Sequence, residues 1–296
     1  MTTPGGTRYL VTGARGMLGR DLLEALADRD VTALGRADLD VTDRDAVFDA
    51  VQGHDVVINA AAYTAVDAAE TDESTAMAVN GVAPGLLAEA TAAQGARLVQ
   101  VSTDYVFDGR ANDPYREDEP LAPVSAYGRT KAEGERAARA ANPDGTFIVR
   151  TAWLYGEHGP NFATTMLKLA RDRETVSVVA DQVGQPTWTL DLAAQIVRLL
   201  DSEAPAGVYH GTAAGRASWF EFAQAVFRVA GLDAARVLPT DSSAFVRPAS
   251  RPDFSVLGHQ AWSEAGLSPM RPWDEALIDA AGRGILEIRD HSASSS

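Results

Sequence analysis

The chain has 296 residues, of which 46% are hydrophobic and 23% charged, which excludes a wholly disordered chain and suits one large α/β unit or two lobes. Its net charge of −15 disfavours general binding to nucleic acid or to anionic membranes. It has no cysteine, no apolar run of ~18 residues and no signal-peptide pattern, so disulfides, thiolate sites and a membrane span are excluded and we expect a cytoplasmic protein.

Short apolar strands alternate with helical patterns over the first 150 residues. This alternation predicts an α/β fold with a Rossmann-like, doubly wound parallel sheet, covered by helices on both faces and joined by right-handed crossovers. We expect strands at 9–11, 31–34, 55–59, 97–102 and 147–150, and helices at 18–27, 43–51, 76–93 and 127–141.

After about residue 151 the alternation becomes irregular. All five tryptophans and many prolines lie in this half, with helices expected at 162–171, 190–200 and 219–229. We therefore predict a Rossmann domain over residues 1–150, to which 182–204 returns. A smaller, less regular C-terminal lobe over 151–296 would bind substrate, with a disordered tail from about 290.

A glycine-rich turn follows the first strand. Gly13, Gly16 and Gly19 form G-x-x-G-x-x-G where the first helix begins. The first glycine permits a tight turn, the second lets the backbone approach a pyrophosphate, and the third lets helix and strand pack closely. The free amides of the helix start then hold the anion. The setting favours dinucleotide binding over a glycine turn without a ligand, and the spacing resembles that of extended short-chain dehydrogenases.

The second strand ends without the acidic residue that usually holds the ribose of NAD. Arg36 stands there instead, and with Arg15 it could pair with the 2′-phosphate of NADPH, which we favour over the alternative that Arg36 is an ordinary solvated side chain. We therefore expect NADPH in the 1–150 domain, with NADH possible. Further cofactor contacts are expected at Met17, Leu18, Asp40, Val41, Ala60, Ala61, Ala62 and Thr64.

A possible proton-transfer set follows the fourth strand. Thr103 ends that strand, and Tyr127 and Lys131 lie four residues apart on one face of a helix. Hydride delivery to a ketone builds negative charge on oxygen, which a nearby acid must neutralise. Lys131 and the charge of the oxidised cofactor are expected to lower the pKa of Tyr127 from ~10. Lys131 could also bind the nicotinamide ribose, and Thr103 the carbonyl oxygen.

Several blocks of sequence together resemble the dTDP-4-dehydrorhamnose reductase family of extended short-chain dehydrogenases/reductases, over nearly the whole chain. The blocks are TGARGMLG, NAAAYTAVDAAE, VSTDYVFDG, YGRTKAEGE, RTAWLYG, DQVGQPT and RPDFS. The resemblance implies that Thr103, Tyr127 and Lys131 are catalytic. It also implies reduction of the 4-keto group of dTDP-4-dehydro-L-rhamnose to dTDP-L-rhamnose.

The resemblance also implies residues on the substrate side. It places Asp104 and Trp153 against the sugar, although Trp153 could instead be a core residue. Asn161 and Gln182 are candidate pocket residues. Arg251 could hold the nucleotide diphosphate or form a surface ion pair.

We expect no metal site. The five histidines show no metal-ligand spacing. Some relatives dimerise around magnesium held by glutamates, but this chain has Asp21 and Leu190 at the comparable places. A monomer and a homodimer both stay open.

Other functions remain as alternatives. The chain could reduce another dTDP-deoxysugar of secondary metabolism, as in dTDP-dihydrostreptose synthesis. It could be a cofactor-binding regulatory subunit like the methionine adenosyltransferase β subunit, against which the intact set of Thr103, Tyr127 and Lys131 argues. An epimerase or dehydratase is disfavoured because Tyr105, not glutamate, follows Asp104 and because Arg36 does not suit tightly held NAD.

Overall fold

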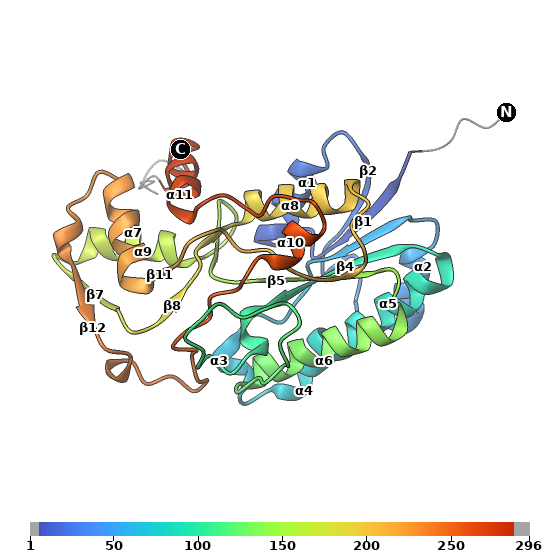
Figure 1. Cartoon of the computed structure of the whole chain (residues 1–296), viewed down its shortest axis with the longest axis horizontal. Coiled ribbons are helices and arrows are strands. Elements are labelled where there is room, and N and C mark those ends of the chain that lie inside the picture. The colour runs from blue at the N-terminus through green and yellow to red at the C-terminus, as the bar shows by residue number, and fades with distance from the viewer. Residues whose placement is uncertain (1–5, 287–296) are drawn as a thin grey trace, which may run out of the picture.

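A six-stranded parallel sheet forms the centre of the protein, in a computed structural model that describes residues 6–286 (Figure 1). The tail predicted from about 290 lies outside these residues. The strand order is β10-β5-β4-β3-β1-β2, so the direction of winding reverses between β1 and β3. In such sheets, ligands bind beyond the carboxyl ends of the strands at this reversal. The strands are β1 (Arg8–Thr12), β2 (Asp30–Leu34), β3 (Val56–Asn59), β4 (Arg97–Thr103), β5 (Thr146–Thr151) and β10 (Gly207–His210).

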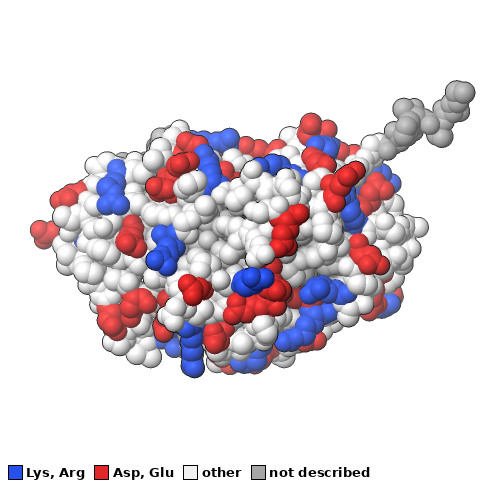
Figure 2. All heavy atoms as spheres, in the orientation of Figure 1, with Lys and Arg blue, Asp and Glu red and all other residues white. Residues whose placement is uncertain are grey.

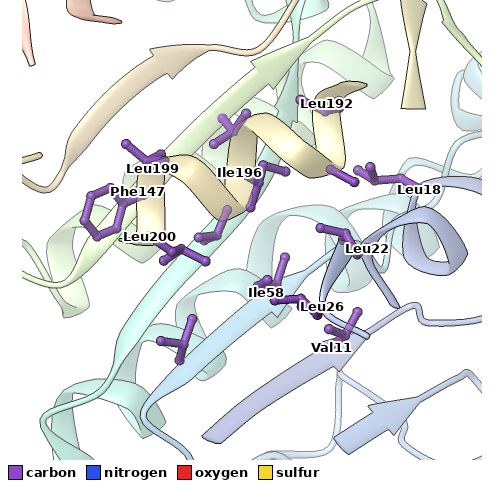
Figure 3. Close-up of a cluster of buried hydrophobic side chains, with 14 of the residues drawn as sticks. Val11, Leu18, Leu22, Leu26, Ile58, Phe147, Leu192, Ile196, Leu199 and Leu200 are labelled. Atoms are coloured by element: carbon purple, nitrogen blue, oxygen red, sulfur yellow. The ribbon is translucent and has the colours of Figure 1, made fainter. Parts of the chain in front are cut away.

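Helices cover both faces of this sheet. On one face, α1 (Met17–Ala25) and α8 (Thr189–Asp201) share a core with the side chains of Val11 and Ile58, as Figure 3 shows. The neighbouring residue Leu10 points to the opposite face, as the two-residue repeat of a strand requires. There it meets α2 (Arg44–Val51), α5 (Ala83–Gln94) and α6 (Ala126–Ala141). Each leucine fully buried in these cores contributes about 2 kcal/mol.

The helix expected at 76–93 is interrupted. It consists of α4 (Glu73–Met77), a π-helical turn η1 (Ala78–Val82) and α5, and it follows a short helix α3 (Val66–Ala69). Pro84 stands in the first turn of α5 and has no amide hydrogen to continue a regular ladder. The Asn80 side chain in the π-helical turn bonds both the N–H and the C=O of Tyr63 and donates to Thr130 Oγ1 of α6. This turn therefore fixes the loop after β3 against α6.

The second half forms its own core from α7 (Phe162–Asp172), α9 (Trp219–Val229) and α11 (Trp273–Gly282). Three short strand pairs complete it: β6 (Leu154–Tyr155) with β9 (Thr187–Trp188), β7 (Val176–Val179) with β12 (Val237–Thr240), and β8 (Val183–Gly184) with β11 (Ala217–Ser218). Short 3-10 turns lie at η2 (Asp104–Val106), η3 (Ala234–Arg236) and η4 (Ser242–Ala244).

Three segments from the second half return to the main sheet. They are α8, the unpredicted edge strand β10, and α10 (Gln260–Glu264), whose fully buried Trp262 packs on Tyr209 of β10. No helix within residues 6–286 is both long and apolar enough to span a bilayer. Basic and acidic side chains are intermingled over the face seen in Figure 2, so the net negative charge does not gather there as one acidic surface.

Candidate active site

The glycine turn and the end of β3 lie in direct contact. Gly13 has φ +65°, and a Cβ on it would lie 2.5 Å from the Ala61 nitrogen. A Cβ on Gly19 would lie 2.2 Å from the Gly13 oxygen, so both positions need glycine. Gly16 begins α1 with no side-chain cap, which leaves the first amides of the helix for an anion. The turn therefore fits a dinucleotide pyrophosphate.

The two candidate arginines for a 2′-phosphate differ in their contacts. Arg15 Nη2 lies 3.2 and 3.0 Å from the two Asp38 carboxylate oxygens, one of which also accepts from the Gly35 N–H. Arg36 is exposed and forms no ion pair within the part of the chain that the structure describes. Arg36 is therefore the cation free to meet a phosphate, whereas Arg15 would share its charge with Asp38.

The other expected cofactor residues meet at the same sheet edge but differ in what they can offer. The side chains of Leu18 and Val41 are buried in the two cores, so only their backbone can contact a ligand. Asp40 accepts from the amide and hydroxyl of Thr42, and these bonds lower its pKa. Met17, Ala60, Ala61 and Ala62 are half-buried, and Thr64 is exposed.

The start of α6 is held firmly at the end of β4. Ser125 caps α6 by accepting from the Gly128 N–H, and a Cβ on Gly128 would lie 2.2 Å from the Tyr105 oxygen. This close approach places the Tyr127 phenol beside the Thr103 hydroxyl and brings the Tyr105 ring edge-on to Tyr127 at 5.6 Å between centroids. The structure thus brings together Thr103 and Tyr127, two members of the predicted set.

Lys131 lies one turn further along α6 and is buried. Its Nζ donates to the Val101 oxygen at 2.6 Å. Burial lowers the pKa of Lys131 to about 8, although the charge of Glu135 acts in the opposite direction. The Lys131 ammonium therefore gives up its proton at a lower pH than an exposed lysine does, and its protonation depends on the neighbouring charges.

Burial raises the pKa of Tyr127 to about 12, and the charge of Asp104 adds to this effect, while the Thr103 hydroxyl lowers it. The expectation that Lys131 lowers this pKa is therefore wrong for the protein on its own, because the Lys131 ammonium is directed to a backbone carbonyl. The phenol is therefore protonated at neutral pH, as it also is at its usual pKa, and burial by itself makes it a weaker acid.

Asp104 follows Thr103 and is almost fully buried. The Thr103 hydroxyl donates to Oδ1 at 2.9 Å. Oδ2 has no well-formed hydrogen bond within residues 6–286, although the Ser255 hydroxyl is near enough to act on the carboxyl. Burial raises the pKa of Asp104 to about 6, against the effects of Ser255 and Thr103. Asp104 Oδ2 is therefore a buried acceptor without a well-formed hydrogen bond.

The Trp153 ring lies in an aromatic stack with a strained backbone. Trp153 has φ +46°, the one positive value for a non-glycine residue within residues 6–286. Its ring stacks on Trp219 with centroids 3.5 Å apart, and a Cβ on Gly184 would lie 2.5 Å from it. Such strain persists only where the surroundings impose it and is often found at ligand sites.

The remaining substrate candidates differ in their availability. The Asn161 side chain caps α7 by accepting from Thr164 and donates to the Gly156 oxygen, so its hydrogen bonds are used within the fold. Gln182 is half-buried and has no side-chain hydrogen bond among the described residues, which leaves it free. Arg251 Nη2 lies 2.9 Å from Asp67 of α3, so the ion pair considered from the sequence is present.

A pocket of about 840 Å³ lies next to these residues, between the loop after β4 and strands β8 and β11. Thr103 and Tyr127 are not among the residues that line it, so it does not hold the reacting atoms. Its lining does include two exposed arginines, Arg110 and Arg216, which belong to no recognisable motif and were therefore not predicted from the sequence. Ser255 and Tyr105 were also missed, although both belong to blocks that carry the resemblance.

Asp21 is buried on α1, and His158 Nε2 lies 4.0 Å from its Oδ1. Oδ2 has no well-formed hydrogen bond within residues 6–286, although the Thr189 hydroxyl is near enough to act on the carboxyl. Burial raises the pKa of Asp21. Within the described residues, no group of three or more histidine, aspartate or glutamate side chains could hold a metal ion.

Comparisons with known proteins agree over most of the chain. A family model described as RmlD substrate binding domain matches residues 7–283. A dTDP-4-dehydrorhamnose reductase from Streptomyces griseus is 53% identical over 281 residues, which cover 92% of either chain. A dTDP-4-keto-6-deoxy-D-glucose reductase from Streptomyces niveus is 50% identical over 277 residues, covering 92% of this chain and 96% of that protein.

A crystal structure of dTDP-4-dehydrorhamnose reductase from Bacillus anthracis in complex with NADP is 38% identical and matches with a TM-score of 0.90. The match covers 94% of this chain and 99% of that one. Together with the six-stranded sheet, this likeness confirms the predicted Rossmann-like α/β fold.

Proposed function

The chain belongs to the dTDP-4-dehydrorhamnose reductase family, and we propose that it reduces the 4-keto group of a dTDP-4-keto-6-deoxyhexose with NADPH. The favoured substrate is dTDP-4-dehydro-L-rhamnose, which would become dTDP-L-rhamnose. The observation that carries the proposal is a half-buried, protonated Tyr127 beside Thr103 at the end of a sheet strand, with Lys131 one helical turn away.

The cofactor site has the donors that NADPH needs. The uncapped start of α1 would hold the pyrophosphate, Arg36 the 2′-phosphate, and the half-buried backbone of Ala60, Ala61 and Ala62 would leave room for the ribose. When bound, NADPH supplies the hydride that the ketone accepts. The NADP in the Bacillus anthracis structure supports this choice of cofactor.

The side chains of this protein would then handle the proton. Tyr127 donates its phenolic proton to the C4 oxygen as that oxygen gains negative charge, so the carbonyl becomes a hydroxyl and the phenol a phenolate. Lys131 stabilises the phenolate, which recovers a proton from solvent. The Thr103 hydroxyl, which donates to Asp104 in the protein on its own, would turn to donate its hydrogen bond to the C4 oxygen. Positioned acid catalysis of this kind contributes about 10²–10⁴-fold to a rate.

The substrate would extend from this acid toward the arginine-lined pocket. Oδ2 of Asp104 would accept from a sugar hydroxyl, with the face of Trp153 and the Gln182 amide as further sugar contacts. Arg251 would hold the diphosphate, while the pocket with Arg110 and Arg216 would take the nucleoside end of the substrate.

A second candidate is reduction of a different dTDP-4-keto sugar of secondary metabolism. The Streptomyces griseus and Streptomyces niveus relatives, named for two different keto sugars, are 53% and 50% identical to this chain. The regulatory-subunit alternative is disfavoured because the folded chain brings Thr103, Tyr127 and Lys131 to one end of β4.

One assay separates these possibilities. The purified protein is incubated with NADPH and dTDP-4-keto-6-deoxyglucose, with and without a 3,5-epimerase, while absorbance of the reduced cofactor is followed. Oxidation that requires the epimerase supports the rhamnose substrate, and oxidation without it supports the D-glucose type. No oxidation under either condition would overturn the proposed activity.

A further inference from the structure

A buried ion pair lies directly behind the candidate active site. Arg150 of β5 and Glu135 of α6 are both 3% exposed, and Arg150 Nη2 lies 2.8 Å from Glu135 Oε2. Arg150 Nε contacts both carboxylate oxygens, at 3.0 and 3.2 Å. Burying two charges costs several kcal/mol in lost hydration, and an apolar pair of similar volume is often as stable. Stability alone therefore does not explain this pair.

The pair is connected to the catalytic end of β4. The Ser102 hydroxyl donates to Glu135 Oε1 at 2.5 Å, and the Lys131 ammonium donates to the oxygen of the preceding residue, Val101. Two successive residues of β4 are thus tied to two successive turns of α6. Since Thr103 is the next residue of the strand, these bonds fix the position of Thr103 relative to α6.

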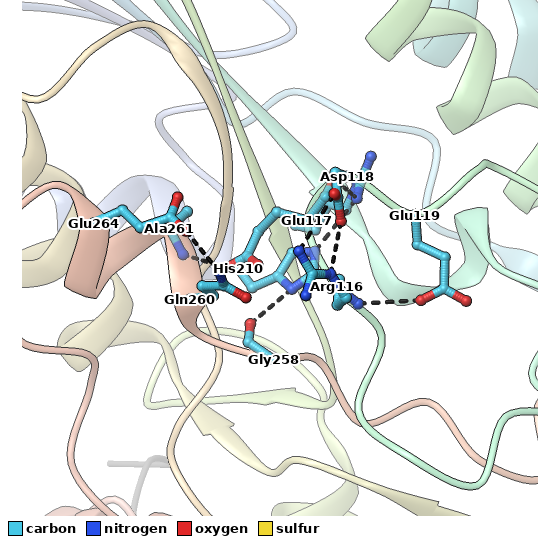
Figure 4. Close-up of polar contacts among 10 residues, drawn as sticks. Arg116, Glu117, Asp118, Glu119, His210, Gly258, Gln260, Ala261 and Glu264 are labelled. Atoms are coloured by element: carbon cyan, nitrogen blue, oxygen red, sulfur yellow. Dashed lines mark hydrogen bonds and ion pairs between the residues drawn. The ribbon is translucent and has the colours of Figure 1, made fainter.

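The arginine cannot easily rotate away from Glu135. Its Nη1 donates to the Glu117 oxygen at 3.2 Å and to His210 Nε2 at 3.3 Å, and its guanidinium lies 5.0 Å from the centre of the Phe107 ring. His210 Nδ1 in turn contacts the Gly258 oxygen, as Figure 4 shows, which leaves Nε2 as the acceptor. Burial and the charge of Arg150 hold the pKa of His210 well below its usual range, so the ring is neutral.

The loop that carries Glu117 is anchored on the other side. The Glu117 carboxylate accepts from the Ala261 N–H at 3.0 Å, a contact drawn in Figure 4. The network therefore spans β4, β5, β10, α6 and α10, and it holds the carboxylate of Glu135 in one position.

The charges around Lys131 come from few groups. On α6 the charge is that of Glu135, one turn after Lys131, whereas the titratable phenol of Tyr127, one turn before it, is uncharged at neutral pH. Asp104 lies just beyond β4, and Arg150 of β5 lies behind Glu135. Lys131 forms no direct ion pair among residues 6–286, so Glu135 is the anion that opposes the effect of burial on its pKa.

We propose that Glu135 is a positioning residue for Lys131: its carboxylate, fixed by Arg150 and Ser102, keeps the Lys131 side chain charged and directed at the end of β4. The role of Lys131 in reduction rests on the proposed function, but the coupling between Glu135 and Lys131 does not. Loss of the carboxylate would leave two buried cations, Arg150 and Lys131, with no anion between them.

The composition of the chain allows a direct test. It contains two lysines, buried Lys131 and exposed Lys168, so protein grown with ¹³Cε-lysine gives two resonances that can be titrated separately by NMR. The variants are Glu135→Gln, Arg150→Met and, as a control of equal charge change on the exposed side of the same helix, Glu133→Gln. Thermal unfolding and the pH profile of kcat/KM are measured on the same samples.

We expect the Lys131 pKa, about 8 in the parent protein, to fall by about one pH unit in Glu135→Gln and not to fall in Arg150→Met. Glu133→Gln and the Lys168 resonance should stay unchanged. The alkaline limb of kcat/KM should move with the Lys131 pKa, whereas both buried variants should unfold at lower temperature.

An unchanged Lys131 titration in Glu135→Gln, with only a lower Tm, would overturn the proposal and leave Glu135 a structural residue. If Glu135→Gln does not fold, Ser102→Ala serves instead, because it frees the carboxylate on one side. Unlike Arg150→Met, this change removes no neighbouring positive charge, so the looser hold on the Glu135 carboxylate should lower the Lys131 pKa, and an unchanged value would overturn the proposal. If the parent protein oxidises no NADPH with either sugar but the lysine titrations behave as expected, the proposed function fails and the coupling stands.

Discussion

Asp67 forms an ion pair with Arg251, the residue that we assign to the substrate diphosphate. Removing the Asp67 carboxylate should therefore strengthen nucleotide binding. Asp67 Oδ2 lies 2.9 Å from Arg251 Nη2 and 3.7 Å from Arg247 Nη1. A diphosphate that binds Arg251 must displace or share this carboxylate. In Asp67→Asn the guanidinium is free, and the apparent affinity for dTDP should rise.

The size of the effect follows from the exposure of the pair. The side chains of Arg251 and Asp67 are 23% and 31% exposed, so solvent screens the pair in part and it is worth about 1 kcal/mol. This free energy corresponds to about a fivefold lower Kd for dTDP. The effect should shrink at high salt.

The assay is isothermal titration calorimetry with dTDP at low ionic strength. The control is Glu73→Gln, which removes one negative charge from the neighbouring helix α4 by breaking the exposed pair with Arg129. A Kd for Asp67→Asn that is no lower than that of Glu73→Gln would refute the idea that Asp67 competes for Arg251. Loss of the difference in an Arg251→Ala background would support it.

Three further predictions concern the cofactor turn and a buried acid. Gly19→Ala should lose most NADPH affinity, measured by fluorescence titration, because its Cβ would lie 2.2 Å from the Gly13 oxygen; unchanged affinity would contradict the close packing of the turn. Arg36→Ala should raise the Kd for NADPH about tenfold and leave that for NADH nearly constant, whereas equal changes would remove Arg36 from the 2′-phosphate site. Asp104 has a pKa of about 6 in the folded state, above its usual value, so the unfolded state loses this proton first as pH rises. The free energy of unfolding should therefore fall by at most about 3 kcal/mol between about pH 4 and pH 6, and Asp104→Asn should abolish this part of the fall in denaturant titrations.

The sequence predicted the parts of the fold that rest on local patterns. Apolar runs and the glycine turn located five strands of the main sheet and the helices between them. It missed β10, because a four-residue edge strand in an irregular region has no distinctive pattern. It also missed the π-helical turn, which depends on contacts of Asn80 with Tyr63 and Thr130, far away along the chain.

The candidate site shows the same division. The order of Thr103, Tyr127 and Lys131 along a strand and a helix was enough to predict that they lie at one end of the sheet. For the protein on its own, the predicted lowering of the Tyr127 pKa by Lys131 is wrong, because burial and Asp104 raise this pKa and the depth of burial is a tertiary property. The Glu135–Arg150 pair was missed for a related reason, since it joins side chains from a helix and from the strand that follows it.

Single-turnover reduction by Tyr127→Phe tests the central claim most directly. The enzyme is held in excess over NADPH, with the keto sugar saturating, and oxidation of the enzyme-bound cofactor is followed in the variant and in the parent protein. Because the ring is kept and only the phenolic hydroxyl is removed, cofactor affinity should stay the same while the rate of oxidation falls about 10³-fold. A Tyr127→Phe variant that oxidises bound NADPH at the rate of the parent protein would contradict the assignment of Tyr127 as the acid.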